Sequence, residues 1–389
     1  MRRTWSWWVF WASIAATVYA YVGYPVLLLL RGIFFPRKFQ RGEITPSVSL
    51  VIAAYNEADF ITRNLDSVLA LDYPADKLEI LVASDGSDDG TNELVKAYNH
   101  PQLRLLELPR QGKNRTLNTA IGFAKGEIIA FTDADSIVRP DSLRRLIAPF
   151  ADPSVGGVSG DYRYPKDIEE GVGERTYWSF DRWLKRIQSQ AGNMISGSGQ
   201  LYAIRREHFR PIPDGASDDF FVSVQPISNG QRLVFEPDAV VSGPVTVSDD
   251  AEFSRKIRVL IRGFNGVWEV RHMLNPLRYK FYALQLFSHK ILRRLVGIPM
   301  IVAALSAPLL WRRGWLYKLA TLGQFGLHGL AVIGYLLRGS NLGRKKFFSM
   351  PFFLDMVNVA GIIAFVRLLR GKRQDVWTTQ RSTEETPQA

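Results

Sequence analysis

An apolar run that carries no charged residue extends from residue 5 to residue 30. A helix of about 20 such residues can cross a bilayer, where backbone polar groups must bond to one another because lipid offers them no partner. A secretory signal peptide would also begin with basic residues such as Arg2 and Arg3, and cleavage would then follow Ala20. The run stays apolar well past Ala20, which favours an uncleaved membrane anchor over residues 1–31.

Basic residues are distributed unevenly around this anchor. More of them follow the apolar run than precede it, and those that follow are Arg31, Arg37, Lys38 and Arg41. Cytoplasmic flanks of membrane segments carry the excess of Lys and Arg. We therefore expect an integral protein of the inner or plasma membrane whose chain continues in the cytoplasm from about residue 40.

The C-terminal part of the chain is apolar again. Segments 295–310 and 316–337 predict a transmembrane hairpin within a C-terminal membrane region, residues 293–371. A third segment, 350–369, has basic residues on both sides. It either crosses the membrane or re-enters from the cytoplasmic face. We expect the remaining residues, 372–389, to form a polar tail.

Composition restricts the class of function. The chain has no cysteine, which excludes disulfides and thiolate metal sites. Its formal net charge is +12, which favours anionic ligands or acidic lipid headgroups. Many of the basic residues flank the apolar segments, so the charge indicates membrane lipids as partners rather than nucleic acid.

Between its apolar ends the chain alternates between two patterns. Short apolar runs rich in β-branched residues predict strands at 48–54, 78–83, 103–108 and 127–132. Segments that favour helix follow them, at 61–69, 92–98, 116–124 and 142–150. Such alternation predicts an α/β domain with a mostly parallel sheet that is covered on both faces.

Polar side chains follow each predicted strand. In chain order these residues are Asn56 and Glu57, then Asp85, then Lys113, and finally Asp133 and Asp135. Ligands of such sheets bind beyond the carboxyl ends of the strands, so these residues are expected to share one site. Mg²⁺ and Mn²⁺ bind through one or two carboxylates plus substrate phosphates, which suits an Asp-x-Asp pair at a strand end.

Three other ligand motifs fail. The stretch DGSDDG, residues 85–90, resembles the start of a calcium loop, but Lys96 occupies the twelfth position, where that loop needs a bidentate glutamate. Neither GxxxxGK[ST] nor GxGxxG follows the first strand, which excludes a P-loop and a dinucleotide fingerprint there.

Several stretches occur along residues 47–245 in a characteristic order, and they read VSLVIAAYNEADFI, SDGSDDGT, QGKNRTLNTAI, FTDADS, SGQLYAIRRE, ASDDFF and FEPDAVV. In this order they resemble a family 2 glycosyltransferase with the GT-A fold. Together with the flanking apolar segments, the chain looks like the membrane-bound polysaccharide synthase branch of that family.

The resemblance implies roles on the donor side of a site. Ala53, Tyr55 and Glu57 would line the nucleoside pocket. Asp85 would recognise the base, expected to be uracil, so that the donor is a UDP-sugar. Lys113 would lie near the diphosphate.

The resemblance also implies a metal centre and a base. Asp133 and Asp135 would hold a divalent cation, Mg²⁺ or Mn²⁺, with Asp135 as the direct ligand and Asp133 also close to the nucleotide sugar. Ser217-Asp218-Asp219 is similar to the family's Thr-Glu-Asp motif, so Asp219 would be the general base. Asp218 and Arg258 would belong to the acceptor and diphosphate region.

An enzyme of this kind would transfer a hexosyl or N-acetylhexosaminyl group with inversion, which gives a β-linkage from an α-linked donor. Processive members carry Gln-x-x-Arg-Trp, whereas residues 255–259 read RKIRV and lack both the Gln and the Trp. Three alternatives therefore stay open. They are a polysaccharide synthase that acts with other assembly proteins, an enzyme that adds one sugar to a lipid carrier or glycolipid, and a non-catalytic nucleotide-sugar-binding subunit of an export complex.

The same segment has a physical reading of its own. Apolar residues recur at helical spacing from Phe253 to Trp268, and arginines fall on another face. This pattern predicts amphipathic helices at the membrane surface over residues 246–292.

Overall fold

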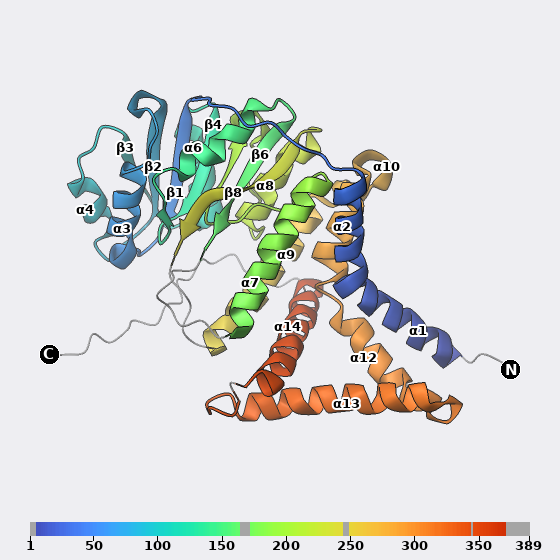
Figure 1. The fold of residues 1–389 in the computed structure, drawn as a ribbon. Coiled ribbons are helices and arrows are strands. Elements are labelled where there is room, and N and C mark those ends of the chain that lie inside the picture. Colours follow the sequence, from blue (N-terminus) through green and yellow to red (C-terminus); the bar gives the residue numbers. More distant parts are fainter. Residues whose placement is uncertain (1–4, 164–171, 244–248, 344, 371–389) are drawn as a thin grey trace.

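The computed structural model describes residues 5–163, 172–243, 249–343 and 345–370. The predicted polar tail, 372–389, lies outside them. Figure 1 shows two regions, a sheet with flanking helices formed by the middle of the chain and a group of longer helices formed by its two ends. The fold class is therefore the predicted one, an α/β domain joined to apolar helices.

The described residues contain one eight-stranded sheet with the order β3-β2-β1-β4-β7-β6-β8-β5. Its strands are β1 Val48–Ala54, β2 Leu78–Asp85, β3 Leu103–Leu108, β4 Ile128–Asp133, β5 Ile137–Val138, β6 Val155–Tyr162, β7 Tyr202–Arg205 and β8 Arg232–Ser242. β1 runs parallel to β2 and β4, and β2 runs parallel to β3. β7 is antiparallel to β4 and β6. The sheet is thus parallel where the sequence predicted it to be, and the antiparallel pairings come from β7 and from β5, which is antiparallel to β8.

Helices cover both faces of the sheet, and strand β1 shows how the sequence specifies this. Every residue of β1 is buried, and its side chains alternate between two hydrophobic clusters. Leu50 and Ile52 pack in the cluster with α3 Ala58–Leu69, α4 Thr91–Ala97 and α6 Ser142–Ile147. Val51 and Ala53 pack in the cluster with α5 Lys113–Phe123 and α8 Asp218–Ser228. Alternate side chains of a strand point to opposite faces, so a continuous apolar run fills both layers.

Three helical segments of the described residues are long and apolar enough to cross a membrane. The first, Trp5–Phe34, consists of α1 Trp5–Val18, a π-turn Tyr19–Gly23 and α2 Tyr24–Phe34. The other two are α13 Trp315–Leu336 and α14 Lys346–Leu369. The segment whose role the sequence left open, 350–369, therefore lies in a helix of full membrane length.

The prediction that residues 295–310 form one arm of a transmembrane hairpin is wrong. That stretch forms α12 Gly297–Ser306, a helix of ten residues. Its length is about 15 Å, which is half the thickness of a hydrocarbon core of about 30 Å. Pro308 begins a 3₁₀ turn, Pro308–Arg313, because proline has no N–H to continue an α-helix.

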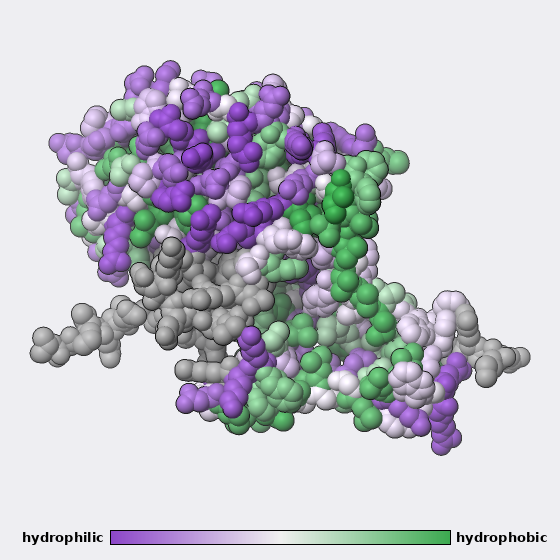
Figure 2. Space-filling model, viewed as in Figure 1, coloured by the Kyte–Doolittle hydropathy of each residue, from purple (hydrophilic) through white to green (hydrophobic). Residues whose placement is uncertain are grey.

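The long helices expose apolar side chains that a water-soluble fold would bury. Figure 2 shows hydrophobic residues over α2 and along α13, whereas the sheet region is mostly hydrophilic. On α13, Leu322, Phe325 and Leu336 are exposed. Polar groups of these helices are instead satisfied within the protein, since His328 Nδ1 lies 2.8 Å from Asp355 Oδ2 across α13 and α14. This distribution suits a lipid environment.

Two further long helices connect the sheet to the membrane helices, α7 Val172–Ala191 and α9 Asp249–Glu269. Short elements complete the chain, namely α10 Pro276–Tyr279, α11 Phe281–Leu286, the π-turn Phe287–Leu292, and 3₁₀ turns at Ala75–Lys77, Ala148–Ala151, Arg206–His208 and Arg271–Leu274.

Helix α9 differs from the predicted surface helix. Its buried residues Ile257, Ile261 and Phe264 pack with Ala360 and Ala364 of α14. The apolar stripe of α9 is therefore covered mainly by protein, because α14 supplies the small side chains that allow two helices to approach closely.

Gly361 of α14 offers a test of another close contact of this helix, with the turn at Arg294 that precedes α12. A Cβ atom at Gly361 would stand 2.2 Å from the backbone oxygen of Arg294, whereas one at Gly326 of α13 would meet nothing within 4 Å. We expect Gly361→Ala to lower the thermal midpoint of the detergent-solubilised protein, with a cost of about 1–3 kcal/mol for the forced shift. Gly326→Ala is the matched control and should leave the midpoint unchanged or raise it slightly. Equal midpoints for the two variants would contradict the close approach.

Candidate active site

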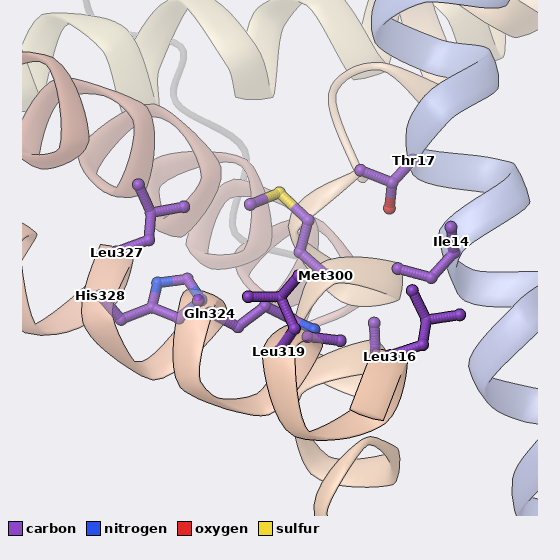
Figure 3. A pocket seen from close by; sticks show the side chains of 11 residues that line it. Ile14, Thr17, Met300, Leu316, Leu319, Gln324, Leu327 and His328 are labelled. Atoms are coloured by element: carbon purple, nitrogen blue, oxygen red, sulfur yellow. The ribbon is translucent and has the colours of Figure 1, made fainter. Parts of the chain in front are cut away.

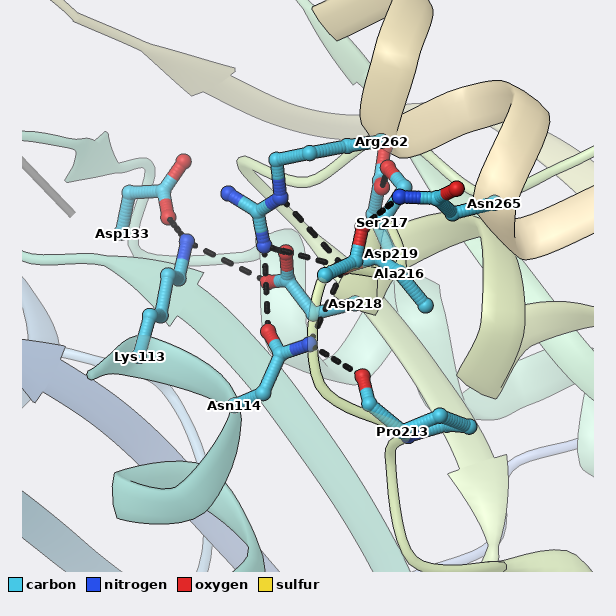
Figure 4. A network of polar contacts seen from close by, with 11 residues as sticks. Lys113, Asn114, Asp133, Pro213, Ala216, Ser217, Asp218, Asp219, Arg262 and Asn265 are labelled. Carbon is cyan, nitrogen blue, oxygen red and sulfur yellow. Dashed lines mark hydrogen bonds and ion pairs between the residues drawn. The ribbon is translucent and has the colours of Figure 1, made fainter. Parts of the chain in front are cut away.

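The carboxyl end of β4 and the first turns of two helices meet at a buried ion-pair cluster. Asp133 is the last residue of β4, Lys113 is the first residue of α5, and Asp218 is the first residue of α8. Lys113 Nζ donates to Asp133 Oδ1 at 2.8 Å and lies 3.3 Å from Asp218 Oδ2 (Figure 4). The cluster joins three segments that are far apart in the sequence.

Charge complementarity keeps this cluster ionised around Lys113. Burial favours the neutral amine, but Asp133 and Asp218 outweigh it and raise the pKa of Lys113. Burial also acts against the Asp218 carboxylate, yet Lys113 and Arg262 lower the pKa of Asp218. Burial raises the pKa of Asp133, and the neighbouring Asp135 adds to that shift while Lys113 opposes it. A permanent cation therefore stands between Asp218 and Asp133, the first carboxylate of the predicted metal motif.

Arg262 of α9 closes the cluster from the other side. Its Nη2 lies 3.1 Å from Asp218 Oδ1 and donates to Asn114 Oδ1 at 3.0 Å. Asn114 Nδ2 in turn donates to the backbone oxygens of Pro213, at 2.7 Å, and Ala216, at 3.0 Å. Figure 4 shows how these bonds hold the loop before α8 between α5 and α9. The role of Arg258, one turn earlier on α9, stays a prediction.

The predicted base lies next to this network. Asp219 is half-buried, and the Ser217 hydroxyl donates to its Oδ1. A Cβ atom at Gly199 would stand 3.8 Å from Asp219 Oδ2 and 3.8 Å from Asp133 Oδ2. The two carboxylates thus face the same small space, with Gly199 at its wall. This arrangement leaves room for a reacting group between a metal-side carboxylate and a base-side carboxylate.

Tyr202 of β7 lies under the same space. Its ring stacks on Phe131 of β4 at 4.6 Å between centroids. Its hydroxyl is buried and has no hydrogen-bond partner among the described residues. Burial, together with the carboxylates of Asp218, Asp219 and Asp133, raises the pKa of Tyr202 well above its usual value. The hydroxyl therefore remains a neutral hydrogen-bonding group close to the carboxylates.

Asp133 and Asp135 fit a hard divalent cation. Both are half-buried at the end of β4, and carboxylate oxygens are the ligands that Mg²⁺ and Mn²⁺ prefer. No group of three or more His, Cys, Asp or Glu residues gathers as a metal site within the described residues. A pair of protein carboxylates is typical of an ion whose remaining ligands come from substrate phosphates and water.

One carboxylate of the predicted nucleoside pocket, Asp85, already has partners within the protein. Asp85 at the end of β2 is fully buried and pairs with Arg110. It also accepts hydrogen bonds from Gln111 N at 2.7 Å, Gly112 N at 3.0 Å and Thr116 Oγ1 at 2.9 Å. In this state Asp85 organises the loop before α5, and Arg110 must move before Asp85 can contact a base.

Arg110 also covers the second pocket residue, since its guanidinium carbon lies 3.4 Å from the centroid of the Tyr55 ring. Glu57 is buried at the start of α3, where its backbone N–H donates to Thr91 Oγ1 at 2.9 Å. Ala53 is buried and lies opposite Asp133 in the β1–β4 ladder. The donor-side residues therefore line one edge of the sheet, while their individual roles stay predictions.

Sequence reasoning missed four residues of this network, Arg110, Asn114, Gly199 and Arg262. Three of them stand beside or within the stretches QGKNRTLNTAI and SGQLYAIRRE, so proximity to a motif was a usable signal. Arg262 lacked such a signal, because its contact with Asp218 bridges 44 positions of the chain.

Comparison with known proteins agrees with this geometry. Residues 49–212 match the model of glycosyl transferase family 2. They form a family 2 glycosyltransferase domain. The succinoglycan biosynthesis protein ExoO of Rhizobium meliloti is 45% identical over 103 residues, which are 26% of this chain and 29% of that protein. The poly-beta-1,6-N-acetyl-D-glucosamine synthase of Staphylococcus aureus is 31% identical over 199 residues, 49% of this chain and 48% of that synthase. The chain thus spans less than half the length of these curated relatives.

A solved structure extends the likeness to nearly the whole fold. The mannosyltransferase PcManGT from Pyrobaculum calidifontis, in complex with GDP-Man and Mn²⁺, aligns with a TM-score of 0.70 and 26% identity. The alignment covers 94% of this chain and 99% of that one, so it includes the apolar helices as well as the sheet. The glycosyltransferase domain of this chain therefore has the GT-A fold.

Asp85 provides a test of the pocket geometry. We expect Asp85→Asn to lower the stability of the donor-free protein by about 1–3 kcal/mol, because the amide turns a donor toward buried N–H groups that need an acceptor. Thermal unfolding without nucleotide would measure the change. Asp88→Asn is the control, since Asp88 is exposed and bonds to Asn56. A donor-free Asp85→Asn protein as stable as the control would contradict a structural role for this carboxylate.

Proposed function

We propose that the protein is an inverting, metal-dependent glycosyltransferase of the membrane that moves a sugar from a nucleotide sugar to a polysaccharide or lipid-linked acceptor. The observation that carries the proposal is the meeting of Asp133 and Asp219 on one small space at the end of β4, beside Lys113. A diphosphate, a cation and an acceptor hydroxyl each have a matching group there.

A UDP-sugar is the first candidate for the donor, with GDP-sugars next. The polysaccharide synthase relative favours an N-acetylhexosaminyl group, and the mannosyltransferase neighbour contains a GDP-sugar. In the proposed complex Tyr55 and Asp85 contact the nucleoside after Arg110 has moved. Lys113 offers its charge to the diphosphate, because the ammonium already faces Asp133 at the same edge.

Transfer would proceed in one step. The acceptor oxygen attacks the anomeric carbon while Asp219 takes the hydroxyl proton, and the bond from that carbon to the diphosphate oxygen breaks with its electron pair on the leaving group. Attack on the face opposite the leaving group inverts the configuration and gives a β-linkage from an α-linked donor. The Ser217 hydroxyl holds Asp219 Oδ1, which leaves Oδ2 toward the space beside Gly199.

Asp133 and Asp135 would hold the divalent cation. When bound, the cation would neutralise the charge that builds on the departing diphosphate. Lys113 and Arg262 keep Asp218 ionised and positioned, so this carboxylate anchors the base-bearing turn rather than accepting a proton.

The location proposed for the enzyme is the inner or plasma membrane, with the sheet on the cytoplasmic side. Three helices of membrane length and the basic residues that follow the first of them support this orientation. Nucleotide sugars are cytoplasmic substrates in such a scheme, and membrane lipids or further assembly proteins complete the set of proposed partners.

Asp219→Asn tests the base. We expect transfer from the best nucleotide sugar of a UDP and GDP panel to fall by about 10²- to 10⁴-fold, because the amide cannot take the acceptor proton. Donor binding, measured by calorimetry, should change little. Asp214→Asn serves as the matched control, since Asp214 pairs with Arg115 at the surface. Full activity of Asp219→Asn would refute the assignment of the base.

Removal of the metal tests the other side of the site. A chelator should abolish transfer in detergent-purified protein, and Mn²⁺ or Mg²⁺ should restore it. Asp135→Asn should raise the metal concentration that gives half-maximal activity, because one carboxylate ligand is lost. Transfer that continues unchanged in chelator would show that the carboxylate pair serves another purpose.

A further inference from the structure

Lys290 is a buried lysine that the proposed chemistry does not use. It is 8% exposed and lies in the π-turn Phe287–Leu292. Among the described residues its Nζ has one hydrogen-bond partner, Ser196 Oγ at 3.0 Å, and no carboxylate at ion-pair distance. Burial of an ammonium without a counter-ion costs several kcal/mol, so a group of this kind indicates an anionic ligand.

Lys290 stands on the base side of the active site. Its Nζ lies 4.8 Å from the ring centroid of Phe220, the residue that follows Asp219. Ser196, which it contacts, lies in the loop that carries Gly199 to the space between Asp133 and Asp219. The donor diphosphate already has Lys113 on the metal side, so a second cation beside the base faces the acceptor.

The same π-turn touches the N-terminal apolar segment. Ser288 Oγ lies 2.8 Å from Tyr19 Oη, and the ring centroids of His289 and Tyr24 are 6.0 Å apart. Tyr19 and Tyr24 belong to the segment Trp5–Phe34 that is long enough to cross a membrane. Lys290 is therefore placed between the base and a membrane helix, where the headgroup of a lipid-borne acceptor would lie.

We propose that Lys290 binds a phosphate group of the acceptor, and that this acceptor is a sugar carried on a lipid phosphate. The proposal rests on the proposed function and names its acceptor class. The phosphate pairs with the Lys290 ammonium, and the sugar extends from it so that one hydroxyl reaches Asp219. π-turns of this kind are rare and often occur at functional sites.

An apolar cavity suits the chain of such a lipid. It has a volume of about 380 Å³ and lies between α1, α12 and α13, where its lining includes Ile14, Met300 and Leu319 (Figure 3). This volume falls within the range of about 300–1,000 Å³ for ligand pockets. α1 lines the cavity with Thr17, and its neighbour Tyr19 reaches the π-turn of Lys290. We assign the cavity to the hydrocarbon chain of the same acceptor.

The charges around Lys290 agree with an anionic ligand. Burial, and then Arg294, lowers the pKa of Lys290 to about 7, with Lys185 acting in the same direction and Asp219 and Asp181 against it. A bound phosphate would favour the ammonium and raise that pKa. Acceptor binding would then take up a proton, so the KM for a phosphate-bearing acceptor should rise as pH increases above 7.

The experiment compares Lys290→Met with Lys290→Arg and with Lys96→Met, an exposed lysine that pairs with Glu107. Three acceptors are offered, namely N-acetylglucosamine joined to farnesyl phosphate, the same sugar joined to farnesol, and N-acetylglucosamine 1-phosphate. Donor hydrolysis without acceptor is measured in parallel, and thermal midpoints confirm that each variant is folded.

We expect Lys290→Met to raise the KM for the farnesyl phosphate acceptor by about 10-fold or more, the effect of a lost charge-assisted hydrogen bond. Donor hydrolysis should stay unchanged, Lys290→Arg should recover most of the affinity, and Lys96→Met should behave as the unaltered protein. The increase in KM with pH above 7 should be present with farnesyl phosphate and absent with farnesol.

Two results would overturn the proposal. Equal use of the farnesol and farnesyl phosphate acceptors by every variant would show that the phosphate has no role in acceptor binding. Equal use of N-acetylglucosamine 1-phosphate and the farnesyl phosphate acceptor would show that the lipid chain has no role in acceptor binding. Failure of the proposed function is a separate outcome, recognised by the absence of both transfer and hydrolysis for every donor of the panel.

Discussion

The Lys113 ammonium is the interaction on which the site depends. It is buried between Asp133 and Asp218, and so it ties the end of β4 to the start of α8 through the start of α5. Removal of one partner from such a buried arrangement would leave an uncompensated charge. The three segments must therefore come together as a unit. Their joining sets the size of the space between Asp133 and Asp219.

The surrounding structure supports that unit at each side. Arg262 attaches Asp218 to α9, and α9 packs its apolar stripe on α14. A helix of membrane length is thus connected to Asp218 through α9 and one ion pair. The candidate site is therefore braced by α9, which packs on a helix that is long and apolar enough to cross a membrane.

Cations divide the site into two halves. Lys113 pairs with Asp133, and Lys290 lies over the ring of Phe220, the residue that follows Asp219. An enzyme that handled an uncharged acceptor would have little reason to bury a second ammonium there. Lys113 has two carboxylate partners, whereas Lys290 has one serine hydroxyl among the described residues, so of these two lysines only Lys290 lacks a counter-ion.

The sequence by itself determined the α/β class, the first four strands and the edge of the sheet where Asp85, Lys113 and Asp133 gather, because strand periodicity and chain order are local signals. It placed Lys113 near a diphosphate but not between Asp133 and Asp218. It also misjudged residues 295–310, since hydropathy records how apolar a segment is but not where Pro308 interrupts its helix. Tertiary structure alone decided that Asp85 pairs with Arg110, that Arg262 pairs with Asp218, and that Lys290 lies beside the segment of Asp219, the proposed base. Each of these depends on contacts between residues far apart in the chain, which no local pattern encodes.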